Sequence, residues 1–531
     1  MPTWNFAAVW EGVAEVVPDR DAVVCGDRRV SWAEFRDRAH RLAGHLASAA
    51  GAVPGDKVAI DLTNRPEYLE TFYAALLLGC VPANVNFRYV ADEIHYVLDN
   101  SDAKAVVAGP HQAHEVERAV ERFPEARRPK LLVAGDDYEK ALAAATPVDA
   151  ARHEPSGDDL VFLYTGGTTG MPKGVMWRNE DLYLGLWAAA RPHRPMPPDP
   201  VEGARHGNRA STVLPAAPLM HGTGLFATIA ALAGAGTAVL VDRPGLDVEA
   251  IWDAVERERV QTLTLVGDVF ARPLLTALDD NPGRWDLSSL RAITSSGVVF
   301  SPETKRGLLR HLDAVSIVDT LGASEGLGPK TIASASDETI APARFRVSER
   351  VRVINEATGL DVVRGSGEVG IVAMGGHIPL GYYKDPEKTR ATFKTIGGTR
   401  YSVPGDYATV DDDGSVQLLG RGSASINTGG EKVFVDEVEL ALRKHTSVAD
   451  CVVVGVPDTR FGERVVALVQ VADGDALDEV ELSTWCRKTL AGYKTPRRFL
   501  FVDSIDRSAA GKAAHARMRE LAIERLSESN A

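Results

Sequence analysis

Short apolar segments alternate with amphipathic segments through the first 300 residues, and this alternation limits the chain to few folds. A serine N-cap with glutamate three positions later, Ser31–Glu34, precedes Phe35, Ala39, Leu42 and Leu46 at helical spacing. Apolar strand patterns recur as KVAIDL (57–62), AVVAG (105–109), KLLVAG (130–135), TLTLVG (262–267) and RAITSSG (291–297). Strands that alternate with helices favour parallel sheets covered by helices.

The pattern changes after about residue 345. Short alternating strands with DDDG- or GG-type turns indicate an antiparallel β unit, and a smaller α+β pattern begins after Arg421. The predicted fold class is α/β. We expect a large N-terminal domain, residues 1–421, of parallel-rich sheets covered by helices plus a small β unit. A small α+β C-terminal domain, residues 422–531, is expected to follow.

Composition excludes several classes of protein. Of the 531 residues, 45% are hydrophobic and 25% charged, which excludes a disordered chain, and a net charge of −14 argues against a general nucleic-acid binder. The most apolar stretch, 225–241, is interrupted by Gly234 and Gly236 and is too short for a membrane span. The N-terminus has no basic region of the kind that secretory signals carry, so a cytoplasmic location is expected. No CxxC pair occurs, which argues against a zinc site or a disulfide framework, since the four cysteines are scattered at Cys25, Cys80, Cys451 and Cys486.

The segment YTGGTTGMPKGV (164–175) carries the strongest chemical signal. An apolar strand runs into a loop with glycines that let backbone N–H groups approach a ligand, threonine hydroxyls and one cation. The residues that supply these groups are Gly166, Gly167, Gly170, Gly174, Thr165, Thr168, Thr169 and Lys173. Groups of this kind suit the binding of a polyphosphate, although the Walker pattern is not met. On composition alone, a flexible turn that binds no ligand remains an alternative.

This loop resembles the phosphate-loop signature of the adenylate-forming superfamily, which comprises acyl-CoA synthetases, peptide-synthetase adenylation domains and luciferases. Further family motifs follow in order across almost the whole chain, and the ordered set is far more specific than any one of them. These motifs are Pro218–Gly224, Ser295–Gly297, Leu321–Glu325, Gly381–Tyr383, Gly405–Asp406, Gly420–Arg421 and Gly511–Lys512.

The resemblance implies a two-step reaction that uses ATP, Mg²⁺ and coenzyme A. A carboxylate attacks the α-phosphate of ATP and releases pyrophosphate; the thiol of coenzyme A then displaces AMP. Catalytic roles are implied for Lys512, Glu325, Thr165 and His221. Glu325 would hold Mg²⁺, Lys512 would enter the site for adenylation, and His221 would line the acyl pocket.

Nucleotide contacts are implied for the phosphate loop and for five further residues, which are Gly297, Asp319, Ser324, Asp406 and Arg421. Asp406 would accept from both ribose hydroxyls, which suits an ionised carboxylate because it offers only acceptors. Leu321 departs from the family's tyrosine, so stacking on adenine is lost. The acyl pocket is expected near His221 and in the segments 266–270, 295–299 and 326–328.

The resemblance also implies that the C-terminal domain rotates between the two steps as a lid. The hinge would be Ser423, where Asp or Lys is more usual in the family. In the second state Gly429, Gly430 and Lys432 would face coenzyme A, although a glycine-rich turn with no such role remains an alternative.

The sequence therefore predicts an ATP-dependent carboxylic acid–CoA ligase, most like bacterial fatty-acyl and steroid-side-chain CoA synthetases, with a small-molecule acid as substrate. Two alternatives stay open: an amide-forming ligase that uses an amine acceptor, and an inactive nucleotide- or acyl-binding homologue. The identity of the acid and the oligomeric state stay open, and a homodimer is one option.

Overall fold

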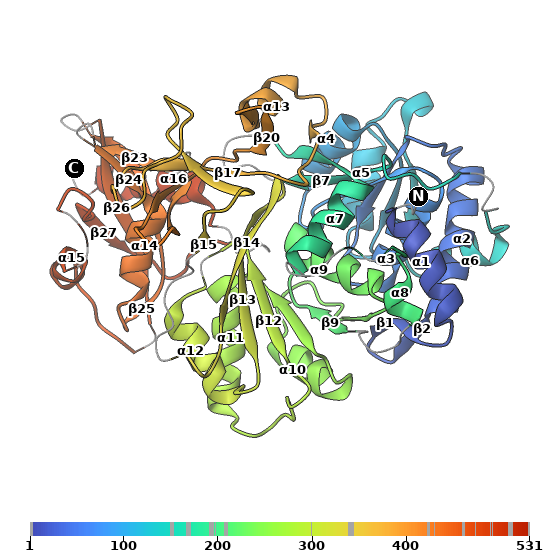
Figure 1. The fold of residues 1–531 in the computed structure, drawn as a ribbon, viewed down its shortest axis with the longest axis horizontal. Helices are drawn as coiled ribbons and strands as arrows, with labels where there is room; N and C mark the ends of the chain where they lie inside the picture. Colours follow the sequence, from blue (N-terminus) through green and yellow to red (C-terminus); the bar gives the residue numbers. More distant parts are fainter. Residues whose placement is uncertain are drawn as a thin grey trace. The chain divides into compact units, whose positions relative to one another are not determined.

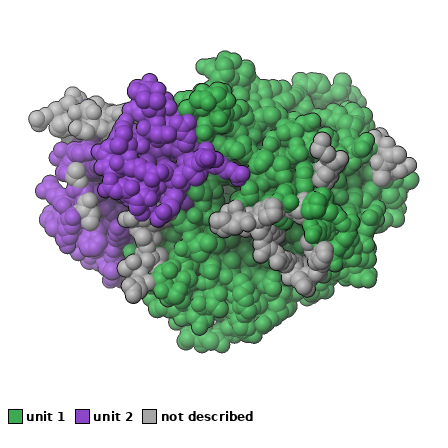
Figure 2. Space-filling view, in the orientation of Figure 1, with its two compact units in different colours: residues 1–166, 172–343, 374–402 green, residues 167–171, 344–373, 403–531 purple. Residues whose placement is uncertain are grey.

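A computed structural model gives the fold in two compact units, shown in different colours in Figure 2. Unit 1 comprises residues 1–166, 172–343 and 374–402, and unit 2 comprises 167–171, 344–373 and 403–531. The residues that the structure describes are 4–148, 153–165, 171–190, 196, 198–205, 211–298, 300–337, 345–421, 425–428, 431–458, 462–472, 474–488, 490, 492–507 and 513–528. These two units are groups of residues that pack together. The predicted boundary between residues 421 and 422 instead separates two domains that would rotate about a hinge, and it stays a prediction.

One sheet of unit 1 has the order β18-β8-β7-β4-β3-β5-β6. Its strands from β7 to β6 are parallel, and β8 and β18 are added antiparallel at one edge. The strands are β3 (Lys57–Asp61), β4 (Val81–Asn84), β5 (Ala103–Ala108), β6 (Lys130–Val133), β7 (Leu160–Thr165), β8 (Lys173–Arg178) and β18 (Gly381–Tyr382). Helices α4 (Ala91–Ser101) and α5 (Ala113–Val120) contribute to the apolar core on this sheet.

A second sheet of unit 1 has the order β14-β13-β12-β11-β9-β10-β1-β2 and is parallel from β13 to β1. Its strands are β1 (Asp21–Cys25), β2 (Arg28–Ser31), β9 (Thr212–Pro215), β10 (Thr237–Leu240), β11 (Thr262–Leu265), β12 (Ala292–Ser296), β13 (Ser316–Ala323) and β14 (Gly326–Ala333). Figure 1 shows α10–α12 beside β12 and β13. These helices are α10 (Val248–Arg257), α11 (Gly267–Asp280) and α12 (Pro302–His311).

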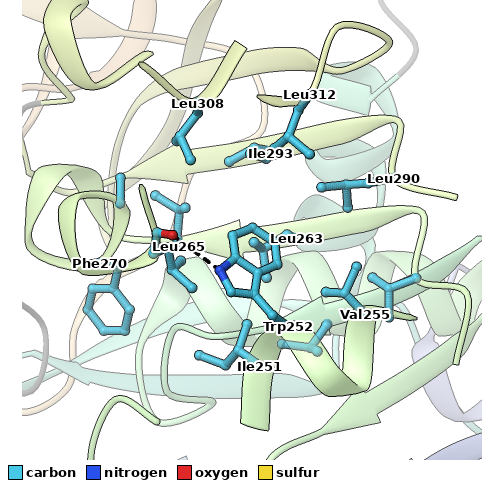
Figure 3. Close-up of a cluster of buried hydrophobic side chains, with 14 of the residues drawn as sticks. Ile251, Trp252, Val255, Leu263, Leu265, Phe270, Leu290, Ile293, Leu308 and Leu312 are labelled. Atoms are coloured by element: carbon cyan, nitrogen blue, oxygen red, sulfur yellow. Dashed lines mark hydrogen bonds between the residues drawn. The ribbon is translucent and has the colours of Figure 1, made fainter. Parts of the chain in front are cut away.

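The core between this sheet and these helices is built around Trp252, which is fully buried. Figure 3 shows its indole among Ile251, Leu263 and Leu290. The indole Nε1 donates to the carbonyl of Leu274 at 3.2 Å. The indole thus buries its apolar surface and still satisfies its only donor, which is the usual requirement for a buried tryptophan. This core holds strands β12 and β13, and the candidate site lies at their carboxyl ends.

Local signals in the sequence explain where several helices of unit 1 begin and end. The Ser31 side chain accepts from the N–H of Glu34 at 3.2 Å and caps α2, Pro66 opens α3, and Gly234 ends α9. The other helical elements and strands of the unit complete the list. They are α1 (Phe6–Val16), α2 (Trp32–Ala49), α3 (Pro66–Leu77), η1 (Glu125–Arg127), α6 (Asp136–Ala144), α7 (Asn179–Ala190), α8 (Glu202–Arg205), α9 (Gly222–Ala233), α13 (Pro386–Thr392), β19 (Phe393–Ile396) and β20 (Thr399–Ser402).

Unit 2 contains antiparallel strands followed by a smaller α+β arrangement. The first group is β15 (Phe345–Arg346), β16 (Val351–Ile354), β17 (Gly370–Met374), β21 (Asp406–Val410) and β22 (Ser415–Arg421). The second is β23 (Ser425–Thr428), β24 (Glu431–Phe434), α14 (Val435–Arg443), β25 (Val448–Asp458), β26 (Gly462–Val471), α15 (Glu479–Arg487), β27 (Arg498–Phe501) and α16 (His515–Glu528). Apolar clusters that include residues of β25 and β26 form the core of this second group.

The observed fold agrees with the α/β class predicted from the alternation of segments. Within the described residues, no helix combines the length and apolar character needed to cross a membrane. None of the four cysteines forms a disulfide. The carboxyl ends of β7, β9, β12 and β13 carry the motifs singled out in the sequence, and ligand sites of parallel sheets form at such ends.

Candidate active site

Thr165 and Lys173 lie opposite each other at the base of the predicted phosphate loop. Strands β7 and β8 pair antiparallel, and their last partners are Thr165 and Lys173. The N–H of Tyr164, one residue earlier, donates to Asn84 Oδ1 at 2.6 Å. The predicted ligands Gly166, Gly167, Thr168 and Thr169 lie outside the described residues, so their role stays a prediction.

Lys173 forms an ion pair with Asp385, the residue that caps α13. The other carboxylate oxygen of Asp385 accepts from the N–H of Lys388 at 2.8 Å. The Lys173 ammonium holds the pKa of Asp385 below its ordinary value. Sequence reasoning missed Asp385, although an Asp-Pro pair is a typical start of a helix and could have located it.

Ser324 and Glu325 form the turn between β13 and β14, since Ala323 and Gly326 on either side pair with each other. The indole Nε1 of Trp177 donates to the Ser324 carbonyl at 2.9 Å, and the Tyr382 hydroxyl donates to Glu325 Oε1 at 2.7 Å. Both donors belong to the first sheet, so these bonds join the phosphate-loop side of the site to the Glu325 turn. Within the described residues, Glu325 Oε2 has no hydrogen-bond partner.

Glu325 fits the predicted role of a magnesium ligand. Mg²⁺ usually takes one or two carboxylates together with phosphate oxygens and water, not a dedicated cage of protein ligands. Among the described residues there is no cluster of three or more His, Cys, Asp and Glu side chains that could hold a metal. The Glu325 carboxylate, with Oε2 available, matches a site in which Mg²⁺ takes one carboxylate together with phosphate oxygens and water.

Asp319, a predicted adenine neighbour on β13, lies in the interior beside Lys305. The Lys305 ammonium is 2.8 Å from Asp319 Oδ2, and the two side chains are 3% and 10% exposed. Burial raises the pKa of Asp319, and Lys305 opposes that effect. Lys305 was not predicted, although its position in α12 three residues before buried Leu308 marks it as facing inward. The nucleotide contact of Asp319 stays a prediction.

Gly297 follows β12 with φ +91°, a conformation that favours glycine. A Cβ at this position would lie 3.8 Å from Val266 and 3.9 Å from Thr223, and the N–H of Gly267 donates to Ser295 Oγ at 2.9 Å. Three of the four segments predicted to form the acyl pocket therefore lie together, while the placement of a ligand there stays a prediction.

Two buried asparagines that the sequence analysis missed hold the loop before His221. Asn64 donates to the carbonyls of Pro215 and Ala217 and accepts from the N–H of Leu219, at 2.9, 3.2 and 2.7 Å. Asn84 donates to the carbonyl of Met220 at 2.6 Å. His221 itself is the N-cap residue of α9. Asn64 and Asn84 occur where buried strands end, and that position was the available signal.

In unit 2 the predicted ribose ligands Asp406 and Arg421 are direct partners across the β21–β22 ladder. Fifteen positions separate them in the chain, and the strand pairing brings their backbones together. Lys432 lies on β24 opposite Asn427. Gly429, Gly430, Ser423 and Lys512 fall outside the described residues, and their predicted roles stay predictions.

Two family models match the chain. The model described as "AMP-binding enzyme" matches residues 10–383, and "AMP-binding enzyme C-terminal domain" matches 437–512. The chain belongs to the AMP-binding enzyme family. The predicted membership of the adenylate-forming superfamily is thereby confirmed.

Relatives of this AMP-binding enzyme indicate its reaction class. It is 40% identical to a medium/long-chain-fatty-acid–CoA/3-oxocholest-4-en-26-oate–CoA ligase of Mycobacterium tuberculosis, over 96% of this chain and 94% of the relative. It is also 40% identical to a 3-oxocholest-4-en-26-oate–CoA ligase of Rhodococcus rhodochrous, with the same coverage. ATP-bound MatB from Rhodopseudomonas palustris shares the fold with a TM-score of 0.79 at 26% identity, over 98% of this chain and 99% of the other. The predicted enzyme class, an AMP-forming acid–CoA ligase, is confirmed.

Proposed function

We propose that this AMP-binding enzyme activates a fatty or steroid-side-chain carboxylic acid in two steps. ATP and the acid give an acyl-adenylate and pyrophosphate, and the thiol of coenzyme A then takes the acyl group and releases AMP. The observation that carries the proposal is the position of the Thr165–Lys173 pair, the Ser324–Glu325 turn and Gly297 at strand ends of the two sheets, with hydrogen bonds from Trp177 and Tyr382 crossing to the Glu325 turn.

The chemistry needs positive charge and hydrogen-bond donors, because an anionic carboxylate must approach a polyphosphate and charge grows at the α-phosphorus. Lys173 and Thr165 are paired at the base of the predicted phosphate loop, where the ammonium and the hydroxyl would bind the phosphates. Glu325 would hold Mg²⁺, which when bound offsets the phosphate charge. Trp177 and Tyr382 keep the Glu325 turn next to the strand that carries Lys173.

The ribose contacts and the groups that change between the two steps are assigned to unit 2. Asp406 and Arg421, paired on β21 and β22, would hold the ribose. Lys512 would enter the site for adenylation. Rotation of residues 422–531 about Ser423 would then replace Lys512 by the segment with Gly429, Gly430 and Lys432, which would accept coenzyme A.

The proposed class of acid is supported by the relatives, which are named for fatty acids and for 3-oxocholest-4-en-26-oate. The meeting of the segments at Thr223, Val266 and Gly297 supports an acyl site at the end of β12. The same relatives favour coenzyme A over an amine as acceptor, which makes the amide-forming alternative the weaker one.

The proposal is tested by incubating the purified protein with ATP, Mg²⁺ and a panel of medium- and long-chain fatty acids and steroid-side-chain acids. Each acid is offered with coenzyme A, with amines, or with neither, and pyrophosphate release and product masses are recorded. We expect pyrophosphate only with a matching acid, and a product whose mass is that of the acyl-CoA.

Glu325→Gln is expected to abolish most of the pyrophosphate release, because it removes the metal-binding charge. Glu303→Gln, an exposed carboxylate in the first turn of α12, is the matched control and should keep full activity. Absence of pyrophosphate with every acid, or an amide as the product, would contradict the proposal.

A further inference from the structure

The corner between β18 and α13 touches two residues of the proposed site. Tyr382 donates its hydroxyl to Glu325 Oε1 at 2.7 Å, and Asp385 forms the ion pair with Lys173. We propose that Tyr382 is a positioning residue, whose hydroxyl holds one oxygen of the Glu325 carboxylate and thereby orients the other oxygen for Mg²⁺. This inference rests on the proposed function and adds a residue to it.

The Tyr382 hydroxyl is the end of a side chain whose position is fixed on every side. The residue is 5% exposed, and its ring centroid lies 5.9 Å from that of Phe393. Its N–H donates to Thr389 Oγ1 at 2.9 Å, and its backbone pairs with Val175 on β8. A packed aromatic side chain has few accessible rotamers, so the hydroxyl is presented at one place.

The backbone that leads into Tyr382 is equally constrained. Arg400 donates to the carbonyls of Pro379 and Leu380, each at 2.7 Å. Gly381 has φ +148°, and a Cβ there would lie 2.4 Å from a side-chain carbon of Thr389. The close approach of Thr389 requires glycine, and it locks the corner against α13.

Glu325, in contrast, depends on this contact for its orientation. It is one of only two residues in the turn between β13 and β14, and it is only partly buried. Within the described residues, the Tyr382 hydroxyl is its only hydrogen-bond partner. A glutamate side chain has several rotatable bonds, so an unheld carboxylate would lose more conformational entropy when it binds a metal.

Tyr383 offers a matched control in the next position of the same corner. Its hydroxyl donates to Asp102 Oδ2 at 2.8 Å, and its ring lies against Phe162. Tyr383→Phe and Tyr382→Phe therefore each remove one hydroxyl that donates to a carboxylate. Only Tyr382→Phe removes the hydroxyl that donates to Glu325, the proposed metal ligand.

The test measures binding of a non-hydrolysable ATP analogue by titration calorimetry, once with Mg²⁺ and once with EDTA. The ratio of the two dissociation constants gives the gain in affinity that Mg²⁺ provides. A hydrogen bond to a charged group suggests that Tyr382→Phe reduces this gain about tenfold. Affinity in EDTA should be unchanged, and Tyr383→Phe should keep the wild-type gain within about twofold.

A double-mutant cycle separates this role from a general structural one. In a Glu325→Gln background, Tyr382→Phe is expected to cause no further loss of the Mg²⁺-dependent gain. The inference is overturned if Tyr382→Phe keeps the wild-type gain, or if it weakens binding equally with Mg²⁺ and with EDTA. Failure of the wild-type protein to release pyrophosphate with any acid would instead count against the proposed function.

Discussion

The buried Lys305–Asp319 pair allows a quantitative test of how the strand that precedes Glu325 is stabilised. Unit charges at the observed 2.8 Å attract by about 6 kcal/mol at an effective dielectric constant of about 20. Burial nevertheless raises the pKa of Asp319, with a further contribution from Asp268, so Lys305 offsets only part of the cost of burying this carboxylate. Loss of the lysine charge would leave the carboxylate with its full desolvation cost.

Lys305→Met keeps the length of the side chain and removes only the ammonium. We expect the free energy of unfolding to fall by about 3–5 kcal/mol at pH 8, the usual cost of breaking a buried pair. The loss should depend on pH. The pKa of Asp319 in the folded protein lies above its ordinary value of 3.8, so its favourable contribution is complete below that pH and is lost as pH rises. Removing Lys305 raises that pKa further, so the penalty of the variant should be smaller at pH 5 than at pH 8.

Urea denaturation at pH 5 and at pH 8, monitored by tryptophan fluorescence, measures the loss in free energy of unfolding and its dependence on pH. The nearby buried carboxylate of Asp268 accepts from the N–H and the hydroxyl of Ser301, and its charge adds to the raised pKa of Asp319. The double variant Lys305→Met/Asp319→Leu should recover stability to within about 1 kcal/mol of the wild type, because neither charge of the pair remains to be buried. A loss below about 1 kcal/mol at pH 8, or an equal loss at both pH values, would refute the reasoning.

Two further predictions concern the loop before His221 and the late lysine. Asn84→Ala should lower the free energy of unfolding by about 1–3 kcal/mol, because it leaves buried groups of Tyr164 and Met220 unpaired. Asn281→Ala, which loses one bond at the end of α11, should cost less in the same urea titration, and a reversed order would contradict the assignment. Lys512→Ala should slow pyrophosphate release roughly 100-fold or more and spare thioester formation from a supplied acyl-adenylate. Equal loss in the two half-reactions, measured separately, would remove its assigned role.

The sequence predicted the elements of the fold well because their signals are local. The cap at Ser31, the helix start at Pro66 and the helix end at Gly234 each depend on neighbours within one turn. Division of the strands into two sheets could not be predicted in this way. Strand β1 pairs with β10, more than 200 positions away, and alternation alone contains no information about such partners.

The same distinction holds for the candidate site. Motif spacing placed Thr165, Gly297 and Glu325 at the ends of strands, and the structure has them there. It missed Asp385, Lys305 and the two asparagines, since each acts through a partner distant in sequence. Tyr382 belonged to a recognised motif, but its contact with Glu325 depends on how one sheet packs against the other.

In the proposed site, groups from both sheets of unit 1 are needed. The sheet with β7 and β8 carries Thr165 and Lys173, and the sheet with β13 leads to Glu325, so neither sheet alone would supply both the cation and the proposed metal ligand. Polar groups on two different sheets keep a fixed spacing only if hydrogen bonds connect the sheets, because apolar packing between them tolerates small shifts. Trp177, Tyr382 and Asn84 make those crossing bonds to the Ser324 carbonyl, the Glu325 carboxylate and the Met220 carbonyl. Tyr382→Phe, which removes one of these bonds and keeps the packed ring, should therefore alter the rate of adenylation more than ligand-free stability, since positioning errors of about 1 Å are costly for a reaction that depends on approach in line.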